Sequence, residues 1–538
     1  MSKSLRWLFC FFFAALLPAM ILRDFTPSNE LRYLSIADEA IRDGHLFAFT
    51  SHGAPYADKP PLYLWIVMAG KLLFGSHCMG FLALFSFFPA LVILRTMDRW
   101  VRSVLDERAR IAGVTMTMTS GLFLGLAVFL RMDMLMCMFI VLSLHAFWRL
   151  YSGEGSSRRA AILFPLYAFL ALFTKGPVGL LVPLLSTVVF LVVQRQWRQI
   201  GRYWGWRTWG ILLAGCAVWF TAVWAEGGTE YLDNLLFHQT LDRAVDAFHH
   251  KAPFYFYGVS VWYSLAPWSL FLAVVFAAAW RQRVRLGELE RFFLSVALST
   301  FVMLSLFSSK LAVYLAPAFP FVVYAAVLLF ARVRVNGWMR AALALPAVIW
   351  TLALPAVAVV ASMPATAFVA NGWCFAAGAL LSAGGVATLW LLFRRRDLYR
   401  SVLALAGGLL CALFVGGFAL PRFNGLLGYG KLCRVAMEVA AEQPDFTGYY
   451  VWKVRRPENM DVYLGEPITE ISVEEALAGQ AAGGVLMLSE RKLRHDENMQ
   501  RFVAGLAFTR SVDGYLVCSL PAVAETADSS QETMPTLP

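Results

Sequence analysis

Long runs of apolar residues with almost no charge recur through most of this chain of 538 residues. Each run approaches the length of a helix that crosses the hydrocarbon core of a bilayer, which needs roughly 20 residues. Hydrophobic residues make up 59% of the chain and charged residues 15%, so several large water-soluble cores would lack the polar surface that they need. The chain is therefore predicted to be an α-helical polytopic membrane protein.

The runs predict about thirteen transmembrane helices. They are the first run, after MSKSLRW, and the runs 79–96, 111–130, 132–151, 160–174, 177–194, 209–226, 256–281, 291–308, 312–331, 340–362, 372–393 and 401–420. A basic start before an apolar run is also typical of a signal peptide, but Pro18-Ala19-Met20 is a poor cleavage site and favours an uncleaved first span. The run 62–75 is short and contains Lys71, so we interpret it as an interfacial or re-entrant helix.

Arginines gather in every second connection between the runs, as they do in cytoplasmic loops. For this reason the net charge of +11 does not indicate a nucleic-acid partner. If the run 62–75 does not cross, all the clusters share the cytoplasmic side with the N-terminus, and the remaining connections face the periplasm of a bacterial inner membrane. The clusters are Arg99/Arg102/Arg108/Arg110, Arg158/Arg159, Arg195/Arg198/Arg202/Arg207, Arg281/Arg283/Arg285, Arg332/Arg334/Arg340 and Arg394/Arg395/Arg396/Arg400.

The polar stretch 23–64 is too long and too rich in ionisable residues for a simple connection between spans. Its apolar residues recur at helical spacing and predict a helix that lies along the membrane surface. Ser28 or Asn29 would cap its start, and Gly44 would end it. The stripe consists of Leu31, Leu34, Ala37 and Ile41.

Hydropathy falls after Pro421, where a small α/β domain of about a hundred residues is expected. We predict a membrane domain at 1–420, a periplasmic α/β domain at 421–522 and a disordered tail at 523–538. The expected strands are 449–454, 484–489 and 515–520, and the expected helices are 474–478 and 498–506. Two of the eight cysteines, Cys433 and Cys518, could pair if this part is periplasmic, and the sequence leaves that open.

Several ionisable residues lie in connections on the predicted outer side. Asp58 and Lys59 precede two prolines that keep the backbone extended, and Lys59 is suited to bind a phosphate at the membrane edge, although snorkelling would also explain it. Arg131 and Asp133 separate two apolar runs, where ionisable residues are costly unless they are paired or functional. A plain salt bridge between these two is the alternative explanation.

Lys175 and Lys310 are single cations at two further outer turns. Each alone is typical of an interface anchor, but several cations that converge from separate connections indicate an anionic headgroup. His249 and His250 end another outer connection. With Asp58, His250 could hold a divalent metal, yet two candidate ligands are weak evidence for a site.

Read together, these segments resemble the integral-membrane GT-C glycosyltransferases of the protein mannosyltransferase and aminoarabinose (lipid A) transferase type. The segments are NELRYLSIADEAIRDG, YADKPPLYLW, RMDMLM, LFTKGPVGLLVP, HHKAPFYFY, PW at Pro267-Trp268 and SSKLAVYLAPAFP. The resemblance implies the GT-C fold, with interfacial helices in the first outer loop and a periplasmic C-terminal α/β domain. It also implies transfer of a sugar from a polyprenyl (undecaprenyl) phosphate to lipid A or to protein.

By this resemblance the donor phosphate would be bound by cations, with a tyrosine nearby. The residues are Lys59, Arg32, Arg131, Lys175, Lys310 and Tyr314. The catalytic positions would be Asn29, Glu30 and Asp133, and Asp58 and His250 match positions that bind zinc in the aminoarabinose transferases. No cofactor is required by the pattern, and zinc is the one metal that it suggests.

The sequence departs from the family at Asn29, where the family has an aspartate. Asn cannot accept a proton, so Glu30 or Asp133 takes that role, or the acceptor needs little deprotonation. A phosphate acceptor is already ionised, which favours a lipid or glycan acceptor over a protein hydroxyl. The alternatives are a protein O-mannosyltransferase-like enzyme, a flippase or transporter of lipid-linked sugar, for which the internal repeats are missing, and a lipid-binding subunit without activity.

Overall fold

The computed structural model describes residues 2–155, 157–237 and 252–521, and they form two compact units. The first unit comprises Met1–Arg23 and Ile36–Arg422, and the second comprises Asp24–Ser35 and Phe423–Pro538. The sequence had placed all of 1–420 in one domain, whereas Asp24–Ser35 groups with the C-terminal part. The expected tail at 523–538 lies outside the described residues.

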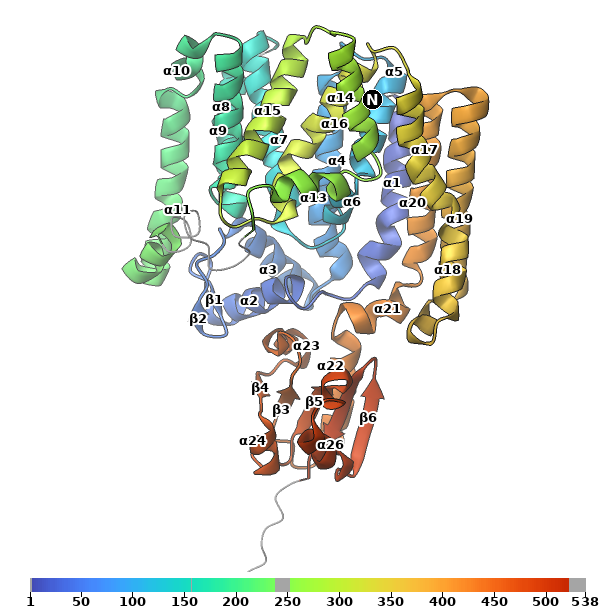
Figure 1. The fold of residues 1–538 in the computed structure, drawn as a ribbon. Helices are drawn as coiled ribbons and strands as arrows, with labels where there is room; N and C mark the ends of the chain where they lie inside the picture. Colours follow the sequence, from blue (N-terminus) through green and yellow to red (C-terminus); the bar gives the residue numbers. More distant parts are fainter. Residues whose placement is uncertain (1, 156, 238–251, 522–538) are drawn as a thin grey trace, which may run out of the picture. The chain divides into compact units, whose positions relative to one another are not determined.

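The first unit is a bundle of long helices (Figure 1). Its longer helices are α1 (Lys3–Leu22), α4 (Met79–Trp100), α5 (Glu107–Met118), α7 (Met132–Ser152), α8 (Ser157–Lys175), α9 (Val178–Val193), α11 (Trp206–Asp233), α14 (Ser269–Arg281), α15 (Glu288–Leu306), α16 (Phe319–Phe330), α17 (Gly337–Thr351), α19 (Gly372–Trp390) and α20 (Leu398–Gly417). Shorter elements are β1 (Thr50–Ser51), β2 (Ala54–Pro55), α3 (Leu62–Phe74), α6 (Gly121–Leu126), η1 (Trp197–Gln199), α10 (Ile200–Tyr203), α13 (Phe256–Ser264), η3 (Ala312–Ala318), α18 (Ala353–Ser362), η4 (Pro364–Val369) and the π-helical turn η5 (Leu391–Arg395). Two helices cross the boundary between the units, α2 (Glu30–Asp43) and α21 (Leu420–Leu427).

Ten helices of the described residues are long and apolar enough to cross a membrane, and the bent pair α13 and α14 makes up to eleven. The two other predicted runs are also helical. The run 177–194 forms α9, which has only 16 residues, and the run 111–130 is divided into α5 and α6. Each apolar run of the sequence therefore forms a helix or a pair of helices.

The runs 111–130 and 256–281 are each divided into two helices, and the two breaks are joined by hydrogen bonds. The helices α13 and α14 meet at 110°. The backbone N–H of Gly121, at the start of α6, donates to the Ala266 carbonyl at 2.8 Å, and the Trp268 indole donates to Thr119 Oγ1 at 3.0 Å. Irregular backbone is tolerated at membrane depth only where protein satisfies it, and here each break satisfies the other.

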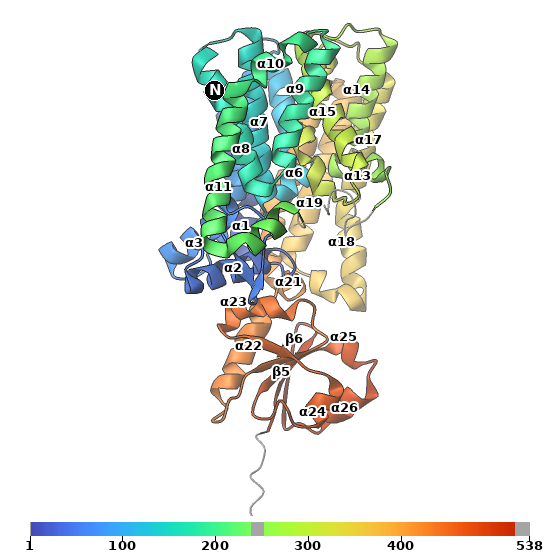
Figure 2. The ribbon, with the colours of Figure 1, turned by 90° about the vertical axis from the view of Figure 1, so that its left-hand side faces the viewer.

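The helices of the first unit run side by side, so their connections collect at two ends (Figures 1 and 2). Lys175 ends α8 and contacts Asp133 at the start of α7, which places both at one end. The arginine clusters lie at the opposite ends of the same helices, such as Arg158 and Arg159 at the start of α8. Arg110 is an exception among them, because it is buried in a two-bond ion pair with Asp98, at 2.8 and 3.0 Å.

The predicted surface helix is α2, which starts directly after Asn29 and ends just before Gly44. Gly44 has φ +76°, the left-handed conformation expected after a helix end. Of the predicted stripe, Leu31, Leu34 and Ala37 are buried. The following helix α3 has 13 residues, so it is about 20 Å long and too short for the roughly 30 Å hydrocarbon core.

The second unit contains a mixed five-stranded sheet in the order β4-β3-β5-β7-β6. Its strands are β3 (Tyr449–Trp452), β4 (Ile468–Glu470), β5 (Val485–Ser489), β6 (Phe508–Val512) and β7 (Tyr515–Ser519). Its helices are α22 (Gly430–Ala441), η6 (Pro457–Met460), α23 (Asp461–Leu464), α24 (Val473–Leu477), α25 (Glu490–Leu493) and α26 (Glu497–Ala504). β3 pairs parallel with β4 and β5, and β7 pairs antiparallel with β5 and β6. The sequence had predicted three of these strands and missed β4 and β6.

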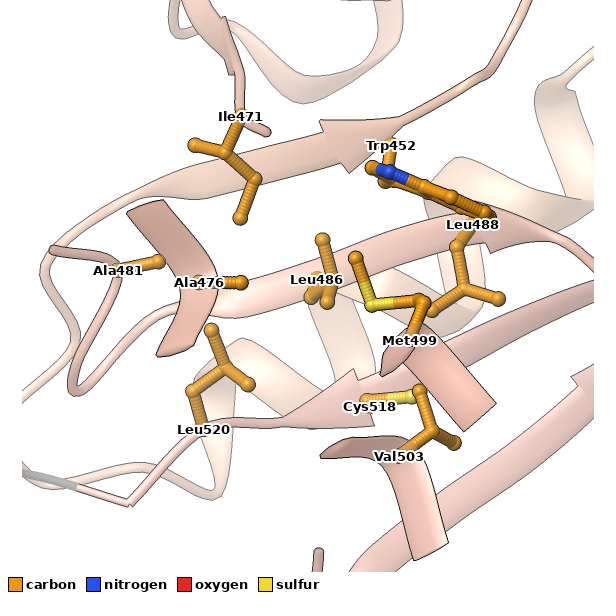
Figure 3. Close-up of a cluster of buried hydrophobic side chains, with 10 residues drawn as sticks. All are labelled: Trp452, Ile471, Ala476, Ala481, Leu486, Leu488, Met499, Val503, Cys518 and Leu520. Carbon is orange, nitrogen blue, oxygen red and sulfur yellow. The ribbon is translucent and has the colours of Figure 1, made fainter. Parts of the chain in front are cut away.

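One face of this sheet carries an apolar core between the strands and the helices α24 and α26 (Figure 3). Leu486 and Leu488 of β5 and Met499 of α26 are completely buried in it. Cys518 of β7 belongs to the same core, and Cys433 is buried in α22. Both are free thiols, so the disulfide that the sequence left open is not formed here. Burial raises the pKa of the Cys518 thiol to about 12.

Asp24 ties the segment Asp24–Ser35 to the rest of the second unit. Its backbone N–H donates to Asn424 Oδ1 at 2.9 Å, and its carboxylate accepts from the backbone N–H of Gly430, at the start of α22, at 2.7 Å. The Tyr463 hydroxyl also donates to this carboxylate, and burial together with the Asp24 charge raises the pKa of Tyr463. An acceptor carboxylate at a helix N-terminus is favoured by the exposed N–H groups and the helix dipole.

Candidate active site

A buried carboxylate with two cations lies where α7 starts and α8 ends. Arg131 has an extended backbone and precedes α7, and Asp133 lies in the first turn of α7 with its side chain 1% exposed. Arg131 Nε donates to Asp133 Oδ2 at 3.0 Å, and Lys175 Nζ, from the end of α8, donates to Oδ1. The salt bridge that the sequence offered as an alternative is therefore present, and Lys175 joins it.

Lys175 makes a second contact that connects this group to η3. Its ammonium lies 4.5 Å from the centroid of the Tyr314 ring, at a distance where cation and ring attract each other. η3 packs against α7, so three separate elements supply Asp133, Lys175 and Tyr314. Lys310 lies just before η3 and is 5% exposed; its ammonium donates to the Phe307 carbonyl at the end of α15.

Lys59 lies in the connection before α3 and forms an ion pair with its neighbour. Lys59 Nζ is 2.8 Å from Asp58 Oδ2, and both side chains are mostly buried, with 17% and 14% exposed. The Tyr56 hydroxyl lies 3.4 Å from the same carboxylate. In this structure Asp58 therefore acts as the ion-pair partner of Lys59.

An apolar cluster relates Lys59 to Lys175. It joins the connection before α3 to the C-terminal part of α8 and to α11, through Ala57, Phe173 and Trp219 among others. Lys59 follows Ala57 by two residues, and Lys175 follows Phe173 by two residues. The connection that carries Lys59 therefore packs against the end of α8 that carries Lys175.

The remaining candidates Asn29, Glu30 and Arg32 belong to the second unit. The carbonyl of Asn29 accepts from the Tyr33 N–H at 3.3 Å, as expected for the residue before α2. The Glu30 side chain is buried, and its Oε2 accepts from the backbone N–H of Thr26 at 2.8 Å. Glu30 thus fixes the chain that enters α2, and the Arg32 guanidinium lies 5.7 Å from the ring of Tyr33.

The described residues do not fit a metal site. Within 2–155, 157–237 and 252–521 no group of three or more His, Cys, Asp or Glu side chains is arranged to hold an ion. Asp58 is bound to Lys59, and His250 lies outside the described residues.

Sequence reasoning missed several residues that hold the connection between α2 and α3. The Glu226 carboxylate and the Tyr231 hydroxyl of α11 bond to its backbone, as does the Glu39 carboxylate of α2. The signal for Glu226 was available, because it is an acidic residue directly at the end of the long apolar run 209–226.

No protein-family model matches the chain. Among curated proteins, the undecaprenyl phosphate-α-4-amino-4-deoxy-L-arabinose arabinosyl transferase of Edwardsiella ictaluri is 25% identical over 333 residues, which are 59% of this chain and 58% of that protein. The protein of the same name from Pseudomonas aeruginosa (strain UCBPP-PA14) is 27% identical over 260 residues, 47% of either chain. The chain thus spans about half of the length of the curated relatives that it matches.

Among solved structures, ArnT from Cupriavidus metallidurans bound to undecaprenyl phosphate superposes with a TM-score of 0.75 at 18% identity. The match covers 96% of this chain and 98% of that one, and the apo form of the same protein matches equally well. The polytopic helical fold that the sequence predicted, with its small C-terminal sheet, is confirmed.

Proposed function

We propose that this chain, a multi-pass inner-membrane protein with the GT-C fold that its motifs predicted, is a glycosyltransferase that uses a polyprenyl-phosphate sugar. It would move a pentose or hexose from undecaprenyl phosphate to a lipid A-like, lipid or glycan acceptor. The names of the relatives support the donor class, since both are undecaprenyl phosphate-dependent arabinosyl transferases.

The observation that carries the proposal is the position of Lys175. This ammonium is held between the Asp133 carboxylate and the Tyr314 ring, at the end of the bundle where the connection with Lys59 also packs. Ionisable side chains are costly at a membrane boundary and are typically retained for function. Asp133 and Asp58 neutralise two of the three cations Arg131, Lys175 and Lys59, so one net positive charge remains to attract a lipid phosphate.

The reaction is a displacement at the anomeric carbon with inversion. The acceptor oxygen forms the new bond to this carbon as the bond to the polyprenyl phosphate oxygen breaks, and the electron pair leaves on the phosphate. Lys175 and Lys59 stabilise the charge that develops on the leaving phosphate, which is electrostatic catalysis by preorganised groups. The donor reaches them by lateral diffusion in the lipid, so no nucleotide-binding motif is needed.

The state of the acidic residues supports an acceptor that is already ionised. Asn29 cannot take a proton, Glu30 is engaged by the Thr26 backbone, and proton uptake by Asp133 would break its ion pairs with Arg131 and Lys175. A serine or threonine hydroxyl needs a base, whereas a phosphate group on a lipid or glycan does not. We therefore propose a phosphate-bearing acceptor.

The proposed active site faces the periplasm. The arginine clusters occupy the opposite ends of the helices that carry Asp133 and Lys175, and arginine-rich connections remain cytoplasmic.

The test is transfer by the purified protein in lipid nanodiscs supplied with undecaprenyl-phosphate sugar and lipid A. Release of undecaprenyl phosphate together with a glycosylated, anomerically inverted lipid supports the proposal. Movement of intact donor between leaflets without release would instead indicate a flippase, and sugar linked to serine or threonine would indicate a protein acceptor. Mass spectrometry of envelope lipids from cells with and without the gene identifies the sugar.

A further inference from the structure

We propose that Glu226 and Tyr231, at the outer end of α11, are positioning residues that fix the connection carrying Asp58 and Lys59. This inference rests on the proposed function for its catalytic meaning, because Lys59 is there a ligand of the donor phosphate. Its structural part, the fixing of the connection, stands by itself and can be measured separately.

Glu226 binds three consecutive backbone N–H groups. Its Oε1 accepts from Leu46 at 2.7 Å, from Phe47 at 3.2 Å and from Ala48 at 3.3 Å, and its Oε2 accepts from Phe47 at 3.0 Å. Hydrogen bonds to an ionised acceptor are about twice as strong as neutral ones. The Glu226 side chain thereby accepts hydrogen bonds from the backbone N–H groups of residues 46–48, which belong to no helix or strand.

Tyr231 continues the contact on the far side of the break in α11 at Gly228. Its hydroxyl accepts from the Phe49 N–H at 3.0 Å and donates to the Tyr56 carbonyl at 2.7 Å. It therefore closes the two sides of the short β1–β2 hairpin against each other. Because both partners of the Tyr231 hydroxyl are backbone groups, this tyrosine fixes the position of the backbone at Phe49 and Tyr56.

The contacts lead from α11 to Lys59 without a gap. Tyr231 holds the Tyr56 backbone, the Tyr56 hydroxyl lies 3.4 Å from Asp58, and Asp58 forms the 2.8 Å pair with Lys59. Each link is one hydrogen bond or ion pair. A shift of the connection by an ångström at Tyr56 would therefore move the ammonium of Lys59 by a similar amount, which matters for catalysis by positioning.

The backbone of α11 is shaped for this close approach. Gly228 has φ +73° and interrupts the helix, and a Cβ on the neighbouring Gly227 would lie 2.7 Å from the Cβ of Ala48. No side chain fits at Gly227 while the connection stays in place. The same junction is filled by the apolar cluster that includes Ala48, Ala57 and Tyr231.

The experiment compares Glu226→Gln and Tyr231→Phe with wild type in nanodiscs, with Glu230→Gln as the control. Glu230 is an exposed glutamate on the same helix, so the control removes one charge from the same place. Two quantities are measured: amide hydrogen exchange of peptides covering residues 45–57, and KM and kcat for the undecaprenyl-phosphate sugar. Tyr231→Phe keeps the ring in its cluster, so it remains informative if Glu226→Gln folds poorly.

We expect amide exchange in 45–57 to accelerate about ten-fold or more in both variants, since each loses hydrogen bonds to the backbone of this segment. KM for the donor should rise about ten-fold, with a smaller change in kcat and none in exchange elsewhere. Unchanged exchange would overturn the inference whatever the enzyme does. Faster exchange with an unaltered KM would reduce both residues to structural supports, and faster exchange in a protein without transferase activity would refute the proposed function alone.

Discussion

Replacing Lys175 by methionine is the sharpest single perturbation of the proposed site. Methionine keeps the length and the apolar stem of the side chain and removes only the ammonium. This removes the ion pair with Asp133 and the cation–π contact with Tyr314 at 4.5 Å.

The two effects of this change have separate magnitudes. The side chains of Lys175 and Asp133 are 9% and 1% exposed, and removing one partner of a buried ion pair costs about 3–5 kcal/mol. Because Arg131 still neutralises Asp133, we expect the lower end, about 3 kcal/mol, in the free energy of unfolding. The loss of one preorganised charge opposite the leaving phosphate should lower kcat by about 100–1000-fold.

The assay pairs thermal or denaturant unfolding in detergent with single-turnover transfer from undecaprenyl-phosphate sugar. Lys71→Met is the matched control, because Lys71 is a half-exposed cation of α3 whose pair with Asp38 measures 3.4 Å. Surface pairs of this kind are worth about 0–1 kcal/mol, so this variant should keep its stability and its rate. A folded Lys175→Met protein that retains wild-type turnover would refute the role of the cation.

Lys59→Met should abolish transfer and lower the free energy of unfolding by about 1–3 kcal/mol, because the mostly buried Asp58 carboxylate loses its 2.8 Å ion pair; turnover of the folded variant within a few-fold of wild type would contradict the role of Lys59. Asp98→Asn should cost about 3–5 kcal/mol of stability by leaving Arg110 buried and uncompensated, with donor affinity unchanged in the folded fraction. Cys518, whose pKa burial raises to about 12, should resist maleimide at pH 8 until the C-terminal unit is unfolded; rapid labelling of the native protein would show the thiol to be accessible. Asp496 caps α26, and its pKa is lowered mainly by the hydrogen bond from the Met499 N–H and also by Lys453. The stability that the ionised carboxylate adds is present above its ordinary pKa of 3.8 and is lost as the pH falls below that value. Asp496→Asn should therefore remove this part of the acid dependence of amide exchange at α26.

The spans were predictable because they depend on local sequence. An apolar run must satisfy its backbone as a helix in lipid, whatever the tertiary structure. The surface helix α2 was predictable for the same reason, from the spacing of Leu31 and Leu34 and from Gly44. The sidedness that the arginine clusters indicate stays a prediction. Isolated charged residues such as Asp133 and Lys175 suggested the position of the candidate site. The structure brings these two side chains into contact.

What sequence could not provide depends on contacts between distant residues. The break after α5 is set by its bonds to the break before α14, with Thr119 and Trp268 149 positions apart. The grouping of Asp24 with the second unit depends on Gly430, 406 positions away. The strand β6 was missed because its residues 508–511 are exposed or largely so, and an exposed edge strand lacks the apolar alternation that identifies strands.

The sequence also underestimated how much of the first outer connection is structural. Glu30 was a predicted catalytic residue, yet its carboxylate accepts from the Thr26 N–H. Glu39, which was not among the predicted site residues, binds Thr50, His52 and Gly53. A carboxylate near backbone N–H groups that lack a ladder is used to satisfy them. Pattern alone does not distinguish that use from proton transfer.

The account depends most on the claim that these cations bind a lipid phosphate. The direct measurement is the affinity of the nanodisc-embedded protein for undecaprenyl phosphate and for undecaprenol, which lacks the phosphate, in wild type and in Lys175→Met. We predict that wild type binds the phosphate at least ten-fold more tightly than the alcohol, and that the variant loses this preference while it still binds the alcohol. Equal affinity for both lipids in wild type, or an unaltered preference in the variant, would contradict the account.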